Sequence, residues 1–193
     1  YKAKENFEQA IEHYQEVIRL EPKSFNAYNN LGILYYQMGR FEEAIECFQL
    51  ALHLRPHHSN ALYNLGNALK EQGKPEEAMR YYQEALDLDP NDVQSRFQIG
   101  HLWQQKGETE QAISHYQHIL DLHPNDVNVL NNLALQFYAQ GRLDQALAHL
   151  RKALQLNPDY FLAHSNLIYC LHFDPHITAQ ELFKAKCQWG EKI

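Results

Sequence analysis

The sequence has few cysteines and no marker of a secreted or membrane protein. Its three cysteines, Cys47, Cys170 and Cys187, are odd in number, widely spaced and include no Cys-x-x-Cys pair, which favours a reducing compartment. It has no Asn-x-Ser/Thr acceptor site, no signal-peptide pattern and no apolar run near the roughly 18 residues that cross a bilayer. These absences predict a cytoplasmic protein that does not associate with membranes.

Charge and motif content exclude further classes of protein. The formal net charge is −7, acidic and basic residues are interspersed, and no run of five like charges occurs, so the chain has no basic surface for nucleic acid. It contains no Gly-x-x-x-x-Gly-Lys-Ser/Thr loop, no His-Glu-x-x-His pair and no glycine-rich nucleotide loop. We therefore expect no nucleic-acid partner, no cofactor and no catalysis by this chain.

The main feature that the sequence does have is a repeat of 34 residues. A fixed period decides the architecture of a chain, because each period is one structural unit. Proline, alanine and glycine recur at this interval, at Pro22, Pro56, Pro90, Pro124 and Pro158, at Ala10, Ala44, Ala78, Ala112 and Ala146, and at Gly39, Gly73, Gly107 and Gly141. The chain is therefore predicted to be an array of similar units.

Each period has the pattern of two amphipathic helices. The first is predicted to end at the glycine, where a left-handed C-cap costs least, and the second before the proline, which cannot continue a helix. The unit is thus a helical hairpin. Small residues on the first helix are expected to let the paired backbones approach closely, and these are Gly32, Gly66, Gly100 and Ala134.

Two groups of residues that resemble active-site or metal-site residues have a simpler explanation in this repeat. One group shares a position at the start of the second helix, where a carboxylate complements the helix dipole. Its members are Glu8, Glu42, Glu76, Glu110 and Asp144. Among twelve histidines, the best pair is His115 and His118, with His149 in the next repeat, but no further ligand has matching spacing. We interpret the histidines as surface residues and predict no metal site.

These residues at this spacing resemble the tetratricopeptide repeat family. The match covers a half repeat in 1–24 and four full repeats, 25–58, 59–92, 93–126 and 127–160. The resemblance implies an all-α fold, a right-handed superhelical α-solenoid of helical hairpins. The period fails in 161–193, which is predicted to be a divergent C-terminal capping hairpin or junction, with a capping box of Thr178 and Glu181 that opens a helix to about Trp189. Because Tyr1 would fall inside a helix, we expect the sequence to be a piece of a longer chain.

Amides are concentrated on the face of the first helices that lines the concave side of such an array. Four positions per repeat form this inner stripe, and eleven of its sixteen residues are asparagine or glutamine. Solvated helix faces usually carry Glu, Lys and Arg, which are better helix formers than Asn, so the amides indicate a function. The predicted peptide-binding residues are Asn26, Asn30, Gln37, Asn60, Asn64, Asn67, Gln94, Gln98, His101, Gln105, Asn128, Asn132 and Asn166.

One column of amides lies at the same depth in every repeat. This amide column consists of Asn30, Asn64, Gln98, Asn132 and Asn166. A carboxamide can pair with the N–H and C=O of one peptide unit without reading its side chain. Inner helices about 10 Å apart match roughly three residues of extended chain, so the column predicts an extended polypeptide as the partner.

Other groove residues are expected to determine which polypeptides bind. The absence of groove Lys and Arg disfavours a clamp for a C-terminal carboxylate, because a buried anion needs a charged partner. Sequence preference would come mainly from ring-bearing side chains, and these are Tyr36, Tyr63, Phe97, His101 and Tyr138.

The C-terminal segment carries a second resemblance. The junction between repeats and catalytic region in SPINDLY-like O-linked N-acetylglucosamine transferases is similar to Ser165-Asn166-Leu167, Asp174-Pro175, Thr178-Ala179-Gln180-Glu181-Leu182-Phe183 and Gln188-Trp189-Gly190-Glu191. That resemblance implies that the repeats recruit protein substrates for such a transferase, whose catalytic lobes are not in this sequence. The alternative is a free-standing scaffold or adaptor for a protein complex. A homodimer is open in both cases.

Overall fold

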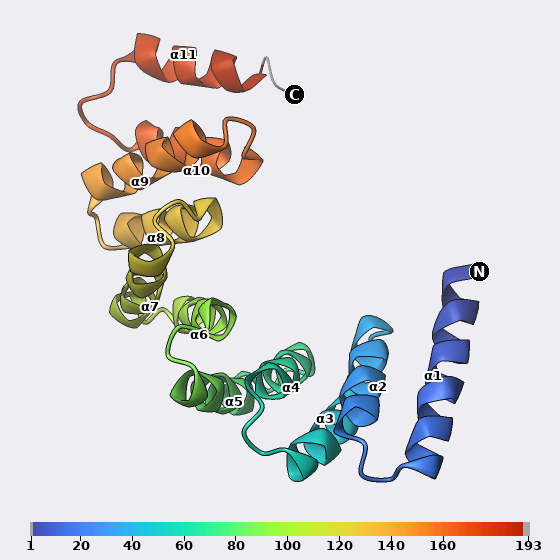
Figure 1. Cartoon of the computed structure of the whole chain (residues 1–193). Helices are drawn as coiled ribbons and strands as arrows, with labels where there is room; N and C mark the ends of the chain where they lie inside the picture. The colour runs from blue at the N-terminus through green and yellow to red at the C-terminus, as the bar shows by residue number, and fades with distance from the viewer. Residues whose placement is uncertain (1, 191–193) are drawn as a thin grey trace. The chain divides into compact units, whose positions relative to one another are not determined.

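The computed structural model describes the chain from residue 2 to residue 190, except for the side chains of residues 2–6, 181, 184, 185 and 188–190. All regular structure in this range is helical, which confirms the predicted all-α fold (Figure 1). The first helices of the hairpins are α2 (Phe25–Gln37), α4 (Ser59–Glu71), α6 (Val93–Gln105), α8 (Val127–Ala139) and α10 (Phe161–His172). The second helices are α1 (Lys2–Leu20), α3 (Phe41–Leu54), α5 (Pro75–Leu88), α7 (Thr109–Leu122), α9 (Leu143–Leu156) and α11 (Ala179–Gly190).

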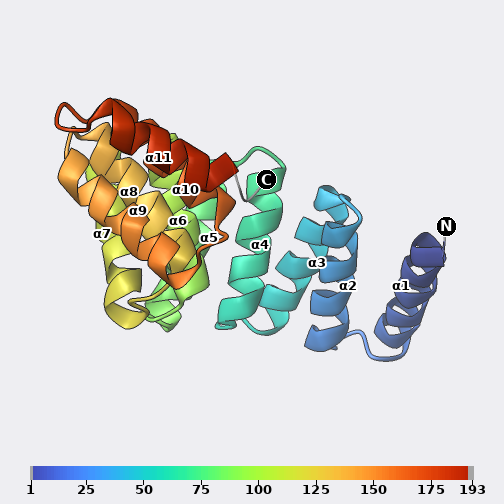
Figure 2. The same ribbon diagram turned by 90° about the horizontal axis from the view of Figure 1, so that it is seen from above.

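The chain forms two compact units, one that ends at Gln98 and one that begins at Ile99, so α6 contributes to both. In the first unit, α2 pairs with α3 and α4 with α5, and α2 and α4 also pack on the second helix before them (Figure 2). In the second unit, α8 pairs with α9, α7 packs on α8, and α9 packs on α10. First helices also contact each other directly, α2 with α4 and α8 with α10. They therefore share one side of each unit.

The turn inside each hairpin depends on a glycine in the left-handed conformation. The four turn glycines, at 39, 73, 107 and 141, have φ between 72° and 81°. The residue after the glycine donates its backbone N–H to the carbonyl five residues before it, as from Arg40 to Tyr35 and from Arg142 to Phe137, each at 2.9 Å. These bonds satisfy carbonyls that the end of the first helix would otherwise leave unpaired. The predicted glycine C-caps are confirmed.

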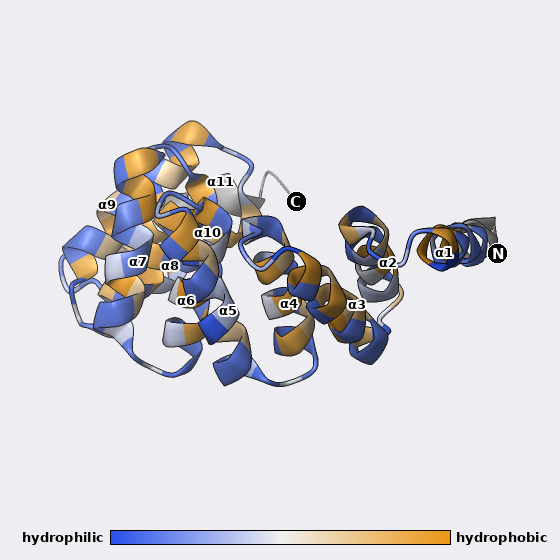
Figure 3. Ribbon diagram, turned by 60° about the horizontal axis from the view of Figure 1, so that its bottom comes forward, coloured by the Kyte–Doolittle hydropathy of each residue, from blue (hydrophilic) through white to orange (hydrophobic). Residues whose placement is uncertain are grey.

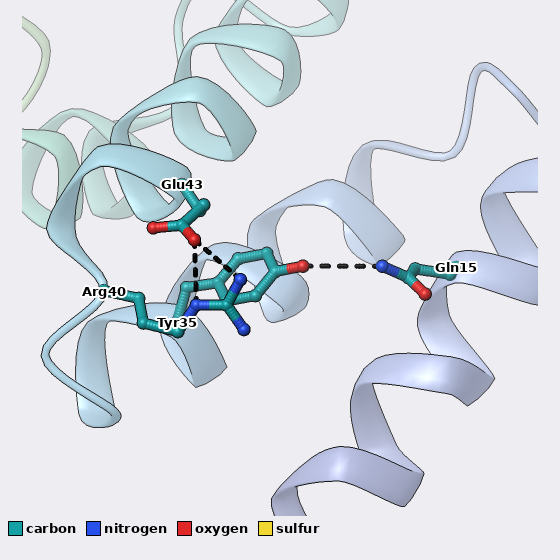
Figure 4. Close-up of polar contacts among 4 residues, drawn as sticks. All are labelled: Gln15, Tyr35, Arg40 and Glu43. Carbon is teal, nitrogen blue, oxygen red and sulfur yellow. Dashed lines mark hydrogen bonds and ion pairs between the residues drawn. The ribbon is translucent and has the colours of Figure 1, made fainter.

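Side chains reinforce the first of these turns. The guanidinium carbon of Arg40 lies 4.4 Å from the centre of the Tyr35 ring, and its Nη2 donates to Glu43 Oε1 at 2.6 Å (Figure 4). The Tyr35 hydroxyl accepts a bond of 3.4 Å from Gln15 Nε2 on α1. An arginine lies over an aromatic ring at the same turn of the α8–α9 hairpin. The turn, the first helix and the preceding second helix are thus connected.

Buried aromatic rings occupy the space that small residues leave on the first helices. A Cβ atom added to the glycine would lie 2.6–2.9 Å from a ring carbon in the pairs Gly32 with Phe48, Gly66 with Tyr82, and Gly100 with Tyr116. Sequence reasoning assigned these glycines to close backbone approach, whereas the structure places a ring of the second helix in the space. In the α8–α9 hairpin the same two positions hold Ala134 and Leu150, both fully buried. Where the first helix has alanine in place of glycine, the second helix therefore has leucine in place of an aromatic residue.

The C-terminal segment continues the array with α10 and α11. Helix α10 packs on α8 and α9, and α11 packs on α10. Helix α11 runs to Gly190, close to the predicted end near Trp189. The predicted capping box involves the side chain of Glu181, which lies outside the described residues, as does Tyr1.

Apolar and hydrophilic residues lie on different faces of many helices (Figure 3). Every helix in residues 2–190 is too short or too polar to cross a bilayer.

Candidate binding surface on the first helices

Every predicted peptide-binding residue is accessible in the structure. Those near the ends of the first helices are exposed, namely Asn26, Gln37, Asn60, Gln94, Gln105 and Asn128. Those in the middle are half-buried, namely Asn30, Asn64, Asn67, Gln98, His101, Asn132 and Asn166. A half-buried amide is partly removed from water, so its hydrogen bond to a ligand is stronger than one at a fully solvated position. The middle of each helix is therefore the better place for binding.

The amide column lies entirely within this half-buried group. Its first three residues belong to the first unit, and Asn132 and Asn166 belong to the second. Asn30 and Asn64 lie on α2 and α4, which contact each other, and Asn132 and Asn166 lie on α8 and α10, which also contact each other. One direct connection is the bond of 2.8 Å from Asn166 Nδ2 on α10 to Asn131 Oδ1 on α8. The column positions on α2 and α4, and those on α8 and α10, therefore lie on neighbouring helices.

Two residues of the column have uncommitted amides. The side chains of Asn64 and Asn132 make no hydrogen bond within the described part of the chain. They occupy the same repeat position, one in each compact unit. Each therefore offers both its carbonyl oxygen and its NH₂ group to a ligand.

Other predicted amides are already partly engaged. Asn30 donates to the Tyr14 hydroxyl at 3.3 Å, and Asn128 accepts from the Tyr160 hydroxyl at 2.9 Å. Because a carboxamide has two donor hydrogens and an oxygen with two lone pairs, these residues keep part of their capacity. The engaged atom nevertheless fixes the orientation of the amide, so a complete donor and acceptor pair is presented at fewer positions than the sequence indicates.

Asn67 is held from inside the protein. The hydroxyl of Tyr82 on α5 donates to Asn67 Oδ1 at 2.7 Å, and Tyr82 is fully buried. Burial raises the pKa of Tyr82 well above its ordinary value, so the hydroxyl keeps its proton at neutral pH. Asn67 is thereby oriented so that its Nδ2 hydrogens are left for a ligand.

One cation does lie on this surface, which corrects the expectation of no groove Lys or Arg. Lys70 Nζ donates to Gln98 Oε1 at 3.1 Å and lies 3.5 Å from Glu71 Oε1. The sequence reasoning missed it because Lys70 stands one residue beside the stripe, and its long side chain reaches the next helix. Glu71 offsets the charge of Lys70, so this part of the surface has little net positive charge. The main effect of Lys70 is its hydrogen bond to Gln98.

The ring-bearing residues predicted to determine sequence preference lie on the same first helices as the amides. The ring of Tyr36 lies 5.7 Å from that of Phe41, and the ring of Tyr63 lies 5.9 Å from that of Tyr82. Burial raises the pKa of Tyr36. Phe97 and His101 are half-buried.

Tyr138 belongs to a group that sequence reasoning missed in part. Its ring packs against Tyr169 and Phe173, and we call these three residues the aromatic cluster. One further step of 34 residues from the stripe positions Leu135 and Ala139 leads to Tyr169 and Phe173. The signal was therefore present, but the stripe was not extended into 161–193.

Cavities in the described part of the chain include three that lie away from the predicted amides. One of about 510 Å³ is lined by 141–145 and 173–176, and one of about 410 Å³ by 122–126. The third, of about 330 Å³, lies beside Pro56, Leu62 and Leu88. None of the three includes a predicted peptide-binding residue. These three cavities are therefore not part of the candidate binding surface.

Family models support the repeat assignment. Two models described as tetratricopeptide repeat match residues 23–91 and 69–135, and a third, described as TPR repeat, matches residues 1–39 and 134–167. Together these matches run from residue 1 to residue 167. No curated protein sequence matches the chain.

Solved structures have the same fold. YrrB, described as a TPR protein with an unusual peptide-binding site, is 26% identical over 84% of each chain, with a TM-score of 0.71. MamA is 24% identical over 81% of this chain and 92% of its own, with a TM-score of 0.75. The C-terminal part of a TPR repeat-containing protein from Cytophaga hutchinsonii is 20% identical over 97% of this chain and 74% of its own, with a TM-score of 0.84. The hairpin geometry, the matched models and these structures agree, and the chain belongs to the tetratricopeptide-repeat family.

Proposed function

We propose that this chain is a protein-interaction module that holds extended segments of other polypeptides along the first helices of its hairpins. The observation that carries the proposal is the pair of uncommitted, half-buried amides at equivalent positions, Asn64 and Asn132. A peptide unit of a folded helix already has its N–H and C=O paired, whereas an extended segment has both free. The amide surface therefore favours a guest that is unfolded locally.

Such binding is weak and tolerant of sequence. Each amide contact contributes about 0.5–1.5 kcal/mol net, whereas association costs an estimated 4–15 kcal/mol. Several contacts along one guest are needed, and none of them reads a guest side chain. The peptide-binding site named for YrrB supports the same kind of role in this chain.

Paired variants test the proposal. A chemically unfolded protein, reduced and carboxymethylated lactalbumin, is the probe, and its folded form is the negative control. The full chain is expected to bind the unfolded form, and the double variant Asn64→Ala/Asn132→Ala is expected to bind it roughly tenfold more weakly.

The matched control is Gln83→Ala/Gln117→Ala. These amides lie on the second helices α5 and α7, where each donates to an aspartate one turn away. Unchanged binding in the control supports the proposal. Equal binding by both double variants, or equal binding of folded and unfolded probe, contradicts it.

We propose more narrowly that the module recruits substrates for an O-linked N-acetylglucosamine transferase. The observation that supports this narrower proposal is the set of junction-like residues in 161–193. The coding sequence after Ile193 tests it, because it must encode a two-lobed glycosyltransferase. In that protein the Asn64→Ala/Asn132→Ala variant must impair protein substrates more than short peptides. A stop codon at that point leaves the free-standing scaffold.

We further propose a cytoplasmic location. Cys47, Cys170 and Cys187 are free thiols, and the first two are buried. Thiols persist in this form in a reducing compartment.

A further inference from the structure

The aromatic cluster forms an exposed apolar surface at one end of the inner stripe in the second unit. Its ring centres are 5.3 Å apart for Tyr138 and Tyr169, 5.2 Å for Tyr169 and Phe173, and 6.1 Å for Tyr138 and Phe173. Tyr169 and Phe173 nevertheless remain 52% and 55% exposed. The rings thus pack side by side and leave their outer surfaces in water.

The hairpin fold does not require these rings. The positions equivalent to Tyr169 and Phe173 in the α4–α5 hairpin hold Asn67 and Glu71, and those in the α6–α7 hairpin hold His101 and Gln105. Both of those hairpins form the same helices with the same glycine turn. Apolar side chains that are more than half exposed and unnecessary for folding are typical of binding surfaces.

The geometry of the cluster selects the chemistry of its ligand. A cation is bound when aromatic faces surround it, but here the rings contact each other at tilted or edge-to-face angles of 56°, 62° and 64°. The space between the faces is therefore already filled. What remains are the exposed outer parts of the rings, an apolar surface that matches an aromatic or aliphatic side chain.

The cluster lies on the same two helices as the last two residues of the amide column. Asn132 lies on α8 with Tyr138, and Asn166 lies on α10 between the exposed Leu162 and Tyr169. An apolar helix face from another protein would cover the rings but would leave the uncommitted amide of Asn132 without a partner, which is costly. An extended peptide supplies backbone groups for the amide and a side chain for the rings.

We propose that the aromatic cluster is a side-chain subsite that selects extended segments carrying an aromatic or large aliphatic residue. This inference rests on the proposed function, since it assigns a preference to the same surface. The amides hold the backbone of any guest, and the cluster adds the contact that distinguishes one guest from another.

The test compares three labelled peptides by fluorescence anisotropy. All are 12-residue chains of Gly, Ser and Thr that differ only in the central residue, which is Phe, Ser or Lys. The Lys peptide tests the cation alternative. The full chain is expected to bind the Phe peptide about tenfold more tightly than the Ser and Lys peptides. The variant Tyr169→Asn/Phe173→Gln is expected to bind all three equally. It keeps the fold because Asn67 and Gln105 occupy the same repeat positions.

Two controls separate this inference from the proposed function. Phe183→Gln removes a more exposed ring, 67% accessible, from α11 and must leave the Phe preference intact. Asn64→Ala/Asn132→Ala must weaken binding of the unfolded lactalbumin probe while the remaining peptide binding still favours Phe.

Each contrary result has a distinct meaning. Binding of the unfolded probe with no Phe preference, a preference for Lys, or a preference that survives Tyr169→Asn/Phe173→Gln overturns the subsite and leaves the proposed function intact. No binding of the unfolded probe overturns both. Self-association of the chain in sedimentation that Tyr169→Asn/Phe173→Gln abolishes would assign the cluster to a second copy and overturn the subsite.

Discussion

The hydroxyl of Tyr82 donates a hydrogen bond of 2.7 Å to the side-chain oxygen of Asn67, so a fully buried residue of α5 orients an amide on the exposed face of α4. The Tyr82 ring also fills the space beside Gly66. One residue therefore connects the packing of a hairpin with the surface that the hairpin presents. At the equivalent position in the α2–α3 hairpin, Phe48 has no hydroxyl, and the stripe residue there is Ile33, which needs none.

Removal of this hydroxyl is expected to have a modest and specific effect. Tyr82→Phe keeps the ring but loses one hydrogen bond, so the free energy of unfolding should fall by about 1 kcal/mol in urea denaturation. Tyr81→Phe is the matched control, because Tyr81 is only half-buried and makes no side-chain hydrogen bond within the described residues. An equal decrease in the free energy of unfolding for Tyr82→Phe and Tyr81→Phe would show that the hydrogen bond to Asn67 does not stabilise the fold.

Gly66 and Tyr82 are expected to be coupled. A Cβ at Gly66 would lie 2.6 Å from Tyr82 Cε1, so Gly66→Ala should destabilise by roughly 1–3 kcal/mol although alanine is the better helix former. The double variant Gly66→Ala/Tyr82→Leu reproduces the residues of Ala134 and Leu150. In urea denaturation, the double variant should lose at least about 1 kcal/mol less unfolding free energy than the sum of the losses of Gly66→Ala and Tyr82→Leu. Strict additivity would contradict the proposed fit.

Gly73 should be sensitive to backbone conformation and insensitive to size. Its φ is 81°, and nothing lies within 4 Å of an added Cβ. Gly73→Ala is therefore expected to cost about 1–2 kcal/mol from backbone strain alone. Gly73→Asn should cost less, because asparagine adopts the left-handed region more readily than alanine. The unfolding temperatures of the two variants test this. A larger decrease for Gly73→Asn than for Gly73→Ala would indicate crowding by the side chain instead of backbone strain.

Buried tyrosines should make the fold sensitive to alkali. Burial raises the pKa of Tyr82 and Tyr116 above the ordinary tyrosine value of about 10, so the fold favours the neutral phenols. This stabilisation is fully present below pH of about 10 and is lost as the pH rises toward the raised folded values. Urea denaturation between about pH 9 and 11.5 should show a falling free energy of unfolding, and Tyr82→Phe/Tyr116→Phe should reduce that slope. An unchanged slope would exclude these two residues as its source.

The hairpin repeat was predictable because its determinants are local and recur. Gly73 ends α4 through its own backbone conformation, and Pro90 follows the end of α5 because it cannot continue a helix. Neither effect depends on a distant contact. The pairing of Gly66 with the Tyr82 ring was not predictable in the same way, since periodicity identifies small positions but not which side chain enters the space beside them.

The amides of the candidate site could be placed from the sequence, but their partners could not. Lys70 engages Gln98 and Tyr160 engages Asn128, and neither Lys70 nor Tyr160 recurs at its repeat position. Hydrogen bonds between neighbouring hairpins depend on side chains and rotamers that differ from repeat to repeat. A periodic pattern therefore locates the column without revealing that Asn64 and Asn132 are its uncommitted members.

The most direct test of the account follows the side-chain amide signals of the ¹⁵N-labelled chain during titration with unfolded, carboxymethylated lactalbumin. The NH₂ signals of Asn64 and Asn132 are expected to shift together and saturably, while those of Gln83 and Gln117 on the second helices stay in place. Shifts of Gln83 and Gln117 without shifts of Asn64 and Asn132 would contradict this expectation, because the guest would then lie on the other face of the hairpins.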